Sequence, residues 1–356
     1  MASSIRGSKE VANVKASDGT EPMSDGGHAG EPEIQIFTQT ADVPAPTRNE
    51  RIVRFLDKHV YAPLAVIKND IRGLIGLSIL VFFVGMGTVG VLLIERAVVM
   101  EAPIYAAPFQ SLEYPLGADN MGRPMHKMII HATPAMLEMT LAGAIFSAVT
   151  GTIIGVVSGY KGGMLDQALM AFTDTVLTIP GLVFVIVLAS FYPPTSPWVV
   201  GLILAIDSWP GLARMVRSQV LSIREESFTE ASRIMGLSQL HILWKDVISN
   251  LMPYISINFA EAARLIIFSS VALYFLGILP FTTANWGVMM NEAYQAGDIT
   301  DPGVVHWLYI PMFAIIFFSL GFILFAQALD RVFNVRLRAR HAKTAVDTDD
   351  ELQPAD

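Results

Sequence analysis

Cysteine is absent from the sequence, and charged residues are scarce in it. Without cysteine, the chain can form no disulfide, no thiol nucleophile and no thiolate metal site. Charged residues make up 16% of the 356 positions, whereas 53% are hydrophobic and the mean hydropathy is +0.49. This composition is too apolar for an ordinary soluble protein and favours a membrane protein.

Signatures of enzyme chemistry are also missing. The sequence has no Gly-Lys-Ser/Thr phosphate loop, so we do not expect this chain to bind or hydrolyse ATP. The stretch "GMGTVG" (Gly85–Gly90) fits the dinucleotide pattern, but it lies in an apolar run without a preceding strand, and close helix packing explains it better. The seven histidines are scattered, without a pair at metal-ligand spacing. We therefore expect a non-catalytic chain with no cofactor and no metal.

Long runs without charge are the most informative feature that is present. A hydrocarbon core about 30 Å thick requires about 20 apolar residues per helix. Runs without Asp, Glu, Lys or Arg cover 74–94, 139–160, 175–206, 265–291 and 302–329. The third run is too long for one helix, and "YPPTSP" (Tyr192–Pro197) breaks it. The pattern predicts an all-α polytopic membrane protein with six transmembrane helices. The expected spans lie near 74–94, 137–158, 167–191, 197–218, 255–279 and 306–329.

Basic residues in the predicted loops indicate the orientation. One set of alternating segments holds 17 lysines and arginines, and the other set holds three. The first set comprises 48–73, 159–166, 214–254 and 330–343, and the second comprises 95–136, 192–196 and 280–305. Loops rich in Lys and Arg stay in the cytoplasm. We therefore expect both termini to be cytoplasmic and the chain to be a multi-pass protein of the plasma membrane.

The two ends of the chain differ from its middle. Residues 1–50 are polar and rich in Gly, Pro, Ser and acids, so they are predicted to form a disordered tail. Residues 341–356 form an acidic tail, and 51–340 form the membrane domain. The net charge of −8 comes largely from the two tails and indicates no partner. No cleavable signal peptide is visible, so the first span would be an uncleaved anchor.

Glycines and prolines mark the predicted spans. Gly151, Gly155 and Gly159 recur every four residues, which places small surfaces on one helix face and lets another backbone approach. The third, fourth and sixth spans contain prolines that can bend them, at Pro180, Pro210 and Pro311. Bent and closely packed helices suit a translocation path, and ordinary packing of a polytopic protein gives the same pattern.

Charged side chains in or near the spans are candidate functional residues. An unpaired charge in the bilayer costs several kcal/mol. Glu261 and Arg264 are three residues apart and can neutralise each other on one helix face. Asp174 and Asp207 lie near predicted span ends, where snorkelling is an alternative to burial. A proton-coupled carrier would use such carboxylates as relays, but the inverted repeat typical of carriers is not apparent.

Residues 227–253, "SFTEASRIMGLSQLHILWKDVISNLMP", are polar although they lie between two spans. Ser227 and Glu230 form a capping box that starts a helix. Gly236 ends that helix, because glycine readily adopts the left-handed conformation. A second helix would carry an apolar stripe of Leu240, Leu243, Val247 and Leu251. The pattern predicts a compact pair of cytoplasmic helices, and a helix lying on the membrane surface is the alternative.

Several motifs resemble those of ABC-importer permease subunits. "EASRIMG" (230–236), followed nine residues later by "DVISN", resembles the EAA loop of that family. Further similar stretches are "DSWPGLARMVRSQVLSIREESF", "PLGADNMGRPMHKMI", "GYKGGMLDQALMAFTDTVLTIPGL", "LYFLGILPFTTANWGVMM" and "ALDRVFNVRLRAR". They cover residues 50–340 in the family's order. The chain most resembles the second permease subunit of the dipeptide, oligopeptide and nickel class.

The resemblance implies the type I permease fold with coupling helices in a cytoplasmic loop at 222–250. In that family the loop docks in a groove of a separate ATPase subunit. The residues expected to couple the two subunits are Ser227, Glu230, Ala231, Gly236 and Leu240. Ser232 departs from the usual alanine and Ser249 from a common proline. Ser270 stands where many relatives have glutamate, a charge that could have moved to Glu261.

The implied partners are a second, homologous permease subunit in a heterodimer, two ATP-binding subunits, an extracytoplasmic solute-binding protein and the lipid membrane, but no nucleic acid. The implied solutes are dipeptides and oligopeptides. The same machinery could instead carry an oligosaccharide or a nickel chelate. A secondary carrier or channel that uses the intramembrane charges is an alternative, and a membrane scaffold without transport is another.

Overall fold

A computed structural model describes residues 70–224, 248–281, 284–296, 301 and 303–333. The elements are α3 (Ile71–Gly85), the π-helix η2 (Met86–Gly90), α4 (Val91–Leu93), α5 (Met125–Lys161), α6 (Gly163–Thr178), α7 (Gly181–Phe191), α8 (Pro197–Leu204), α9 (Trp209–Arg224), α12 (Ser249–Phe275), α13 (Trp286–Gln295) and α14 (His306–Phe333). Over these ranges β-structure is limited to one isolated bridge between Ala118 and Pro124. The all-α prediction is therefore confirmed for the described residues.

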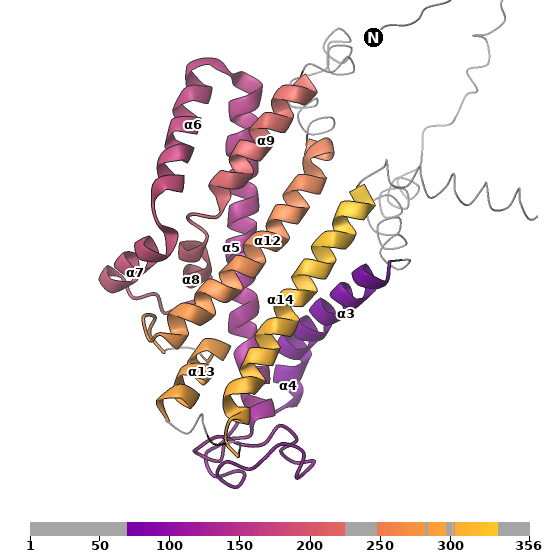
Figure 1. Ribbon diagram of the computed structural model, residues 1–356, viewed down its shortest axis with the longest axis vertical. Coiled ribbons are helices and arrows are strands. Elements are labelled where there is room, and N and C mark those ends of the chain that lie inside the picture. Colours follow the sequence, from indigo (N-terminus) through magenta and orange to yellow (C-terminus); the bar gives the residue numbers. More distant parts are fainter. Residues whose placement is uncertain (1–69, 225–247, 282–283, 297–300, 302, 334–356) are drawn as a thin grey trace, which may run out of the picture. The chain divides into compact units, whose positions relative to one another are not determined.

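The long helices form a bundle around α5 (Figure 1). Helices α9 and α12 pack against α5, and α14 lies between α12 and α3. Residues 94–124, between α4 and α5, lie at one end of the bundle, which we call the loop end. At the opposite end α3 begins, α9 and α14 stop, and a tight turn joins α5 to α6.

The described residues contain six candidate spans if each bent helix pair is counted as one span. Four continuous stretches among them are long and apolar enough to cross a membrane. They are Ile71–Leu93, Met125–Lys161, Leu251–Phe275 and His306–Arg331. Two further candidates are pairs, Gly163–Thr178 with Gly181–Phe191, bent by 82°, and Pro197–Leu204 with Trp209–Ser222, bent by 55°. The third and fourth predicted spans are therefore broken helices.

Two helices extend beyond the spans that were predicted near them. Helix α5 begins at Met125, before the span expected near 137–158, because Met125, Ile129, Ala132 and Met136 recur at helical spacing and are buried. Polar neighbours in this segment hide that face from a search for charge-free runs. Helix α12 begins at Ser249 and not near 255, and it continues through an internal proline, Pro253.

The predicted glycine stripe forms the contact between α5 and α9. A Cβ added at Gly151, Gly155 or Gly159 would lie 2.8, 2.5 or 2.9 Å from a backbone carbonyl oxygen of α9. The carbonyls belong to Trp209, Ala213 and Arg217, one turn apart on α9. Only glycine leaves room for this approach. The close-packing interpretation is confirmed.

The prolines mark the breaks. Pro180 precedes α7 at the sharp bend after α6, and Pro210 lies in the first turn of α9 after the break that follows α8. Pro311 lies inside α14, which continues through it. Residues 192–196 separate α7 from α8, as "YPPTSP" predicted. Pro180 and Pro210 therefore lie at helix starts, where the N–H that proline lacks is not needed for a helical hydrogen bond. Pro311 is accommodated inside a helix.

Helices α3 and α14 are joined along their length and at one end. A Cβ at Gly76 would lie 2.7 Å from the Phe325 nitrogen, so the two helices touch backbone to backbone. At the opposite end, Asp70 caps α3 through the Arg72 N–H at 3.2 Å. Its carboxylate also pairs with Arg331 of α14 at 2.9 Å. This ion pair fixes the start of the first span against the end of the last.

An aromatic cluster forms the core near the loop end. The rings of Phe83, Trp286 and Phe318 lie with centroids 4.9 to 5.7 Å apart. They come from α3, α13 and α14, and all three side chains are buried. The indole nitrogen of Trp286 also donates to the Ile129 carbonyl of α5 at 3.5 Å. The short helix α13 is thereby held firmly against three long helices.

Candidate functional site

The predicted coupling residues lie outside the described residues. Ser227, Glu230, Ala231, Gly236 and Leu240 all belong to 225–247, and their expected role stays a prediction. The helices on either side are described: α9 ends at Arg224 and α12 begins at Ser249.

Both flanking helices are fixed at the opposite end of the bundle. Val216 and Val220 of α9 and Leu251 of α12 are fully buried in one apolar cluster, together with Val156 of α5. Leu251 was predicted to end an amphipathic stripe that began at Leu240, but it lies in α12 and packs on α9. The two helices that flank residues 225–247 are therefore packed against each other and against α5.

A polar network ties α9 to the start of α6. The Arg217 guanidinium donates through two nitrogens to the two carboxylate oxygens of Asp166, each at 2.6 Å. The hydroxyl of Ser158 on α5 donates to the same carboxylate. Such a bidentate pair fixes both distance and orientation. The sequence analysis missed this network, and the acid just after the Gly162–Gly163 turn is the signal that could have indicated it.

Asp174 has a partner that the sequence did not suggest. Its carboxylate accepts from Arg214 of α9, with Nε at 2.9 Å. Both side chains are about half exposed, at 54% and 52%. Asp174 was singled out as a charge in or near a span, and it is neither unpaired nor buried within this chain.

Glu261 and Arg264 form the expected pair on α12. Arg264 Nε donates to Glu261 Oε2 at 3.1 Å, and a second nitrogen contacts the other carboxylate oxygen. The Glu261 side chain is 52% exposed and that of Arg264 is 28% exposed. The pair is therefore compensated, and it lies on the surface of the chain.

The two pairs belong to one surface. Asn258, one turn before Glu261 on α12, places its amide nitrogen 3.7 Å from the sulfur of Met215, which follows Arg214 on α9. We call Asp174, Arg214, Glu261 and Arg264 the charged face. It spans α6, α9 and α12, of which α9 contacts both of the others (Figure 1).

Asp207 lies where the two bent pairs meet. It belongs to the break between α8 and α9, and its side chain fills the space that a Cβ at Gly181 would need. Neighbouring apolar residues, among them Val185 and Ile203, enclose a small cavity of about 140 Å³ beside it. Asp207 forms no ion pair with any residue that the structure describes. Any larger residue at position 181 would therefore displace the Asp207 carboxylate.

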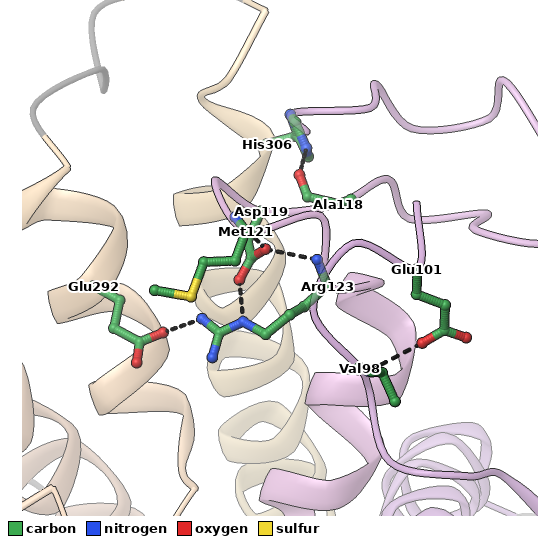
Figure 2. A network of polar contacts seen from close by, with 8 residues as sticks. All are labelled: Val98, Glu101, Ala118, Asp119, Met121, Arg123, Glu292 and His306. Carbon is green, nitrogen blue, oxygen red and sulfur yellow. Dashed lines mark hydrogen bonds and ion pairs between the residues drawn. The ribbon is translucent and has the colours of Figure 1, made fainter. Parts of the chain in front are cut away.

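A second polar network lies at the loop end (Figure 2). Asp119 is fully buried and accepts the backbone N–H groups of Met121 and Arg123 at 2.9 and 2.8 Å. The Arg123 guanidinium contacts the same carboxylate and reaches Glu292 of α13 at 2.7 Å. Burial alone would lower the Arg123 pKa, but its bonds and attraction to the two acids outweigh burial and raise that pKa. The turn at 119–123 is therefore locked onto α13.

Glu101 and Lys127 form a further pair at the loop end. The Lys127 ammonium donates to one oxygen of Glu101, and the Val98 N–H donates to the other at 3.1 Å. The hydrogen bond from Lys127, followed by that from Val98, lowers the pKa of Glu101. Lys127 is thereby held at the first turn of α5. None of these loop-end residues was singled out from the sequence.

The comparisons with known proteins agree with the motifs. The family of binding-protein-dependent transport system inner membrane components matches residues 151–339. Oligopeptide transport system permease protein OppC of Lactococcus lactis subsp. cremoris is 31% identical over 241 residues, which cover 66% of this chain and 80% of the relative. Dipeptide transport system permease protein DppC of Bacillus subtilis is 28% identical over 279 residues, covering 76% and 84%.

A solved structure titled as inward facing conformations of the MetNI methionine ABC transporter contains a chain that aligns with a TM-score of 0.42 and 18% identity. The alignment covers 58% of this chain and 98% of that chain. The family match and the two permease relatives agree with the resemblance carried by the EAA-like loop and its neighbouring motifs. This chain belongs to the family of binding-protein-dependent transport system inner membrane components, the permease subunits of ABC importers.

Proposed function

We propose that this chain is one of two homologous permease subunits of an ATP-driven importer for dipeptides and oligopeptides. It forms half of the translocation path and consumes no ATP itself. Two separate ATP-binding subunits supply the energy, and an extracytoplasmic solute-binding protein delivers the peptide. The family match supports the transport role, and the names of the oligopeptide and dipeptide relatives support the solute.

The observation that carries the proposal is the charged face. Asp174 lies on one bent helix pair and Arg214 on the other, and the side chains of both are about half exposed although each pair is a candidate membrane span. Lipid is a poor neighbour for such groups, because polar side chains in hydrocarbon cost several kcal/mol. Water or a second protein is a suitable neighbour. We therefore propose that α6, α9 and α12 turn this face toward the path and the partner permease.

The coupling segment is proposed to lie at the other end of the same helices. Residues 225–247 join α9 to α12, the two helices that carry Arg214 and Glu261. A displacement of this segment by the ATP-binding subunits would reach the charged face through α9 and α12. Glu230, Ala231 and Gly236 would then make contact with the ATP-binding subunit.

The test is uptake by the whole complex reconstituted with its ATP-binding subunits and binding protein. Gly236→Val would place a β-branched residue at a position predicted to be left-handed, a conformation that costs such a residue about 1–2 kcal/mol. We expect peptide uptake to fall about five- to thirtyfold, while assembly in the membrane is unchanged. Glu230→Lys should remove the cap and also reduce uptake. Gly211→Ala is the matched control, because nothing lies within 4 Å of its added Cβ.

Three outcomes would contradict the proposal. Normal uptake in both Gly236→Val and Glu230→Lys would leave the segment as a helix lying on the membrane. Peptide uptake without the ATP-binding subunits would favour a secondary carrier that uses the intramembrane charges. Uptake of an oligosaccharide or a nickel chelate in place of peptides would keep the machinery and change the solute.

A further inference from the structure

A cavity of about 580 Å³ opens at the loop end of the bundle. Its volume falls within the range of about 300–1,000 Å³ that is usual for small-molecule sites. The last turn of the first span, the start of α5, the start of α8 and α13 all contribute to its wall. The charged face is on other helices, so this cavity is a separate site.

Three basic side chains line the part of the cavity nearest the loop end, which we call the entrance. Arg123 and Lys127 line it at the start of α5, and Arg96 lines it from the chain that follows α4. Arg123 and Lys127 are held in place by acids that do not belong to the lining. Arg96 forms no ion pair with the described part of the chain. The entrance is therefore suited to an anionic group.

One carboxylate lies deeper in the same wall. Glu138 follows Lys127 on α5 by eleven residues, about three helical turns, so the two side chains share a helix face about 16 Å apart along the axis. His131 lies between them and also lines the cavity. Glu138 is partly buried and has no ion-pair partner among the residues described. An unpaired carboxylate inside a membrane helix indicates a functional site, where a bound ligand would supply the cationic partner.

We propose that this cavity is a transit site for a short peptide and recognises both of its charged ends. The C-terminal carboxylate contacts the basic entrance, with Arg96 as its main ligand, and the N-terminal ammonium contacts Glu138. An extended chain rises about 3.4 Å per residue, so the rise of about 16 Å along α5 from Lys127, at the entrance, to Glu138 suits a peptide of about four or five residues. The inference rests on the proposed import of peptides and names the part of the path that reads the termini.

The charge pattern favours a zwitterion over a simple anion. A site for anions alone would have no use for a carboxylate on the same wall, because Glu138 would repel the ligand. The apolar remainder of the lining, which includes Met128 and Met289, tolerates varied side chains. Recognition of the two termini with a permissive middle suits a solute whose side chains vary.

The absence of cysteine makes a direct test possible. Met128→Cys places a single thiol in the cavity wall. The complex is reconstituted with versions of the other subunits from which any cysteines have been removed. We would measure its alkylation rate in the presence of loaded binding protein and tetra-alanine, N-acetyl-tetra-alanine or tetra-alanine amide. Tetra-alanine should slow alkylation. Half-maximal protection should require about a tenfold higher concentration of either blocked peptide than of tetra-alanine, because each blocked peptide loses one charge-assisted contact.

Second-site variants assign each terminus to its residue. With Glu138→Gln, the N-acetyl peptide should protect as well as the free peptide, while the amide still protects poorly. Arg96→Gln should give the converse pattern. Glu138→Asp retains the carboxylate and should retain the preference for a free N-terminus, which separates recognition from damage to the fold. The same binding protein is used throughout, so its own selectivity cancels when the protection by one peptide is compared between wild type and a variant.

Two results would overturn this inference while the proposed function stands. One is equal protection by all three peptides. The other is no protection by any of them in a complex that still accumulates tetra-alanine. A complex that accumulates no peptide at all, with ATP and binding protein present, would instead overturn the proposed function and the transit site with it.

Discussion

At the scale of single residues, the glycine stripe of α5 gives a clear prediction. Gly155→Val would place a Cβ 2.5 Å from the Ala213 carbonyl oxygen, so α5 and α9 would have to separate. Overpacking of this kind costs about 1–3 kcal/mol. We expect a lower thermal midpoint of the purified complex. Gly211→Ala meets open space and should leave the midpoint unchanged or raise it slightly. Equal midpoints for the two variants would mean that the α5–α9 contact is looser than described.

The pair on α12 can be tested by a double-mutant cycle. Removing either Glu261 or Arg264 leaves an orphan charge among apolar helices, whereas removing both leaves none. Glu261→Gln alone and Arg264→Gln alone should therefore reduce the yield of assembled complex more than the double variant does. Purely additive losses in yield would show that the two side chains do not compensate each other in the membrane.

Glu101 predicts a dependence on pH at the loop end. Its pKa is lowered by Lys127 and Val98, so the charged form is the one that the folded state favours. The stabilisation is present above the ordinary pKa of 4.5 and is lost as pH falls through the lowered folded value. Between pH 6 and pH 3 the thermal midpoint of wild type should fall more than that of Glu101→Gln. Parallel curves for the two proteins would contradict the pairing.

At the scale of elements, the sequence predicted features that repeat locally along the chain. It did not predict contacts between residues that are far apart in the chain. The charge-free runs gave the spans, and glycines every four residues gave the α5–α9 contact. Arg214 lies 40 positions from Asp174, and Arg123 lies 169 positions from Glu292. No local pattern connects such residues, because their contacts depend on how helices are arranged. The charged residues themselves were visible in the sequence, but the residues with which they pair were not.

Helix ends were the other weak point, and the reason is physical. The first three turns of α5 contain Lys127 and His131, which line a cavity, beside buried Met125 and Ile129. A helix that serves a polar cavity on one side has no charge-free run there. Helix α12 likewise begins before the span expected near 255–279 and continues through Pro253, although proline usually marks a helix boundary. Polar residues on a cavity wall and a proline inside a helix therefore hide the sequence signals by which the start of a helix is recognised.

The ion pair between α6 and α9 gives a prediction at this scale. Asp166→Ala leaves the Arg217 guanidinium without its bidentate partner and should cost about 1–3 kcal/mol. Both residues are near the opposite end of the bundle, where α9 leads into the proposed coupling segment. Uptake should fall in Asp166→Ala and in Arg217→Ala, with partial recovery in the charge swap Asp166→Arg with Arg217→Asp. A swap no better than either single variant would reduce the pair to an incidental contact.

At the scale of the whole molecule, topology is the prediction on which the coupling argument depends. Helix α5 has 37 residues and is about 55 Å long, so its two ends lie on opposite sides of a membrane. Residue 120 lies just before α5, and residue 295 ends α13. These segments are joined by the 2.7 Å contact between Arg123 and Glu292, so both must lie on one side.

The distribution of 17 basic residues against three predicts that this side lies outside the cytoplasm. A reporter that is active only in the cytoplasm should be silent when fused after residue 120 or 295. The same reporter should be active when fused after residue 161, at the turn between α5 and α6. Activity after residue 120 would invert the molecule. It would place residues 225–247 outside the cell, beyond the reach of any cytoplasmic ATP-binding subunit.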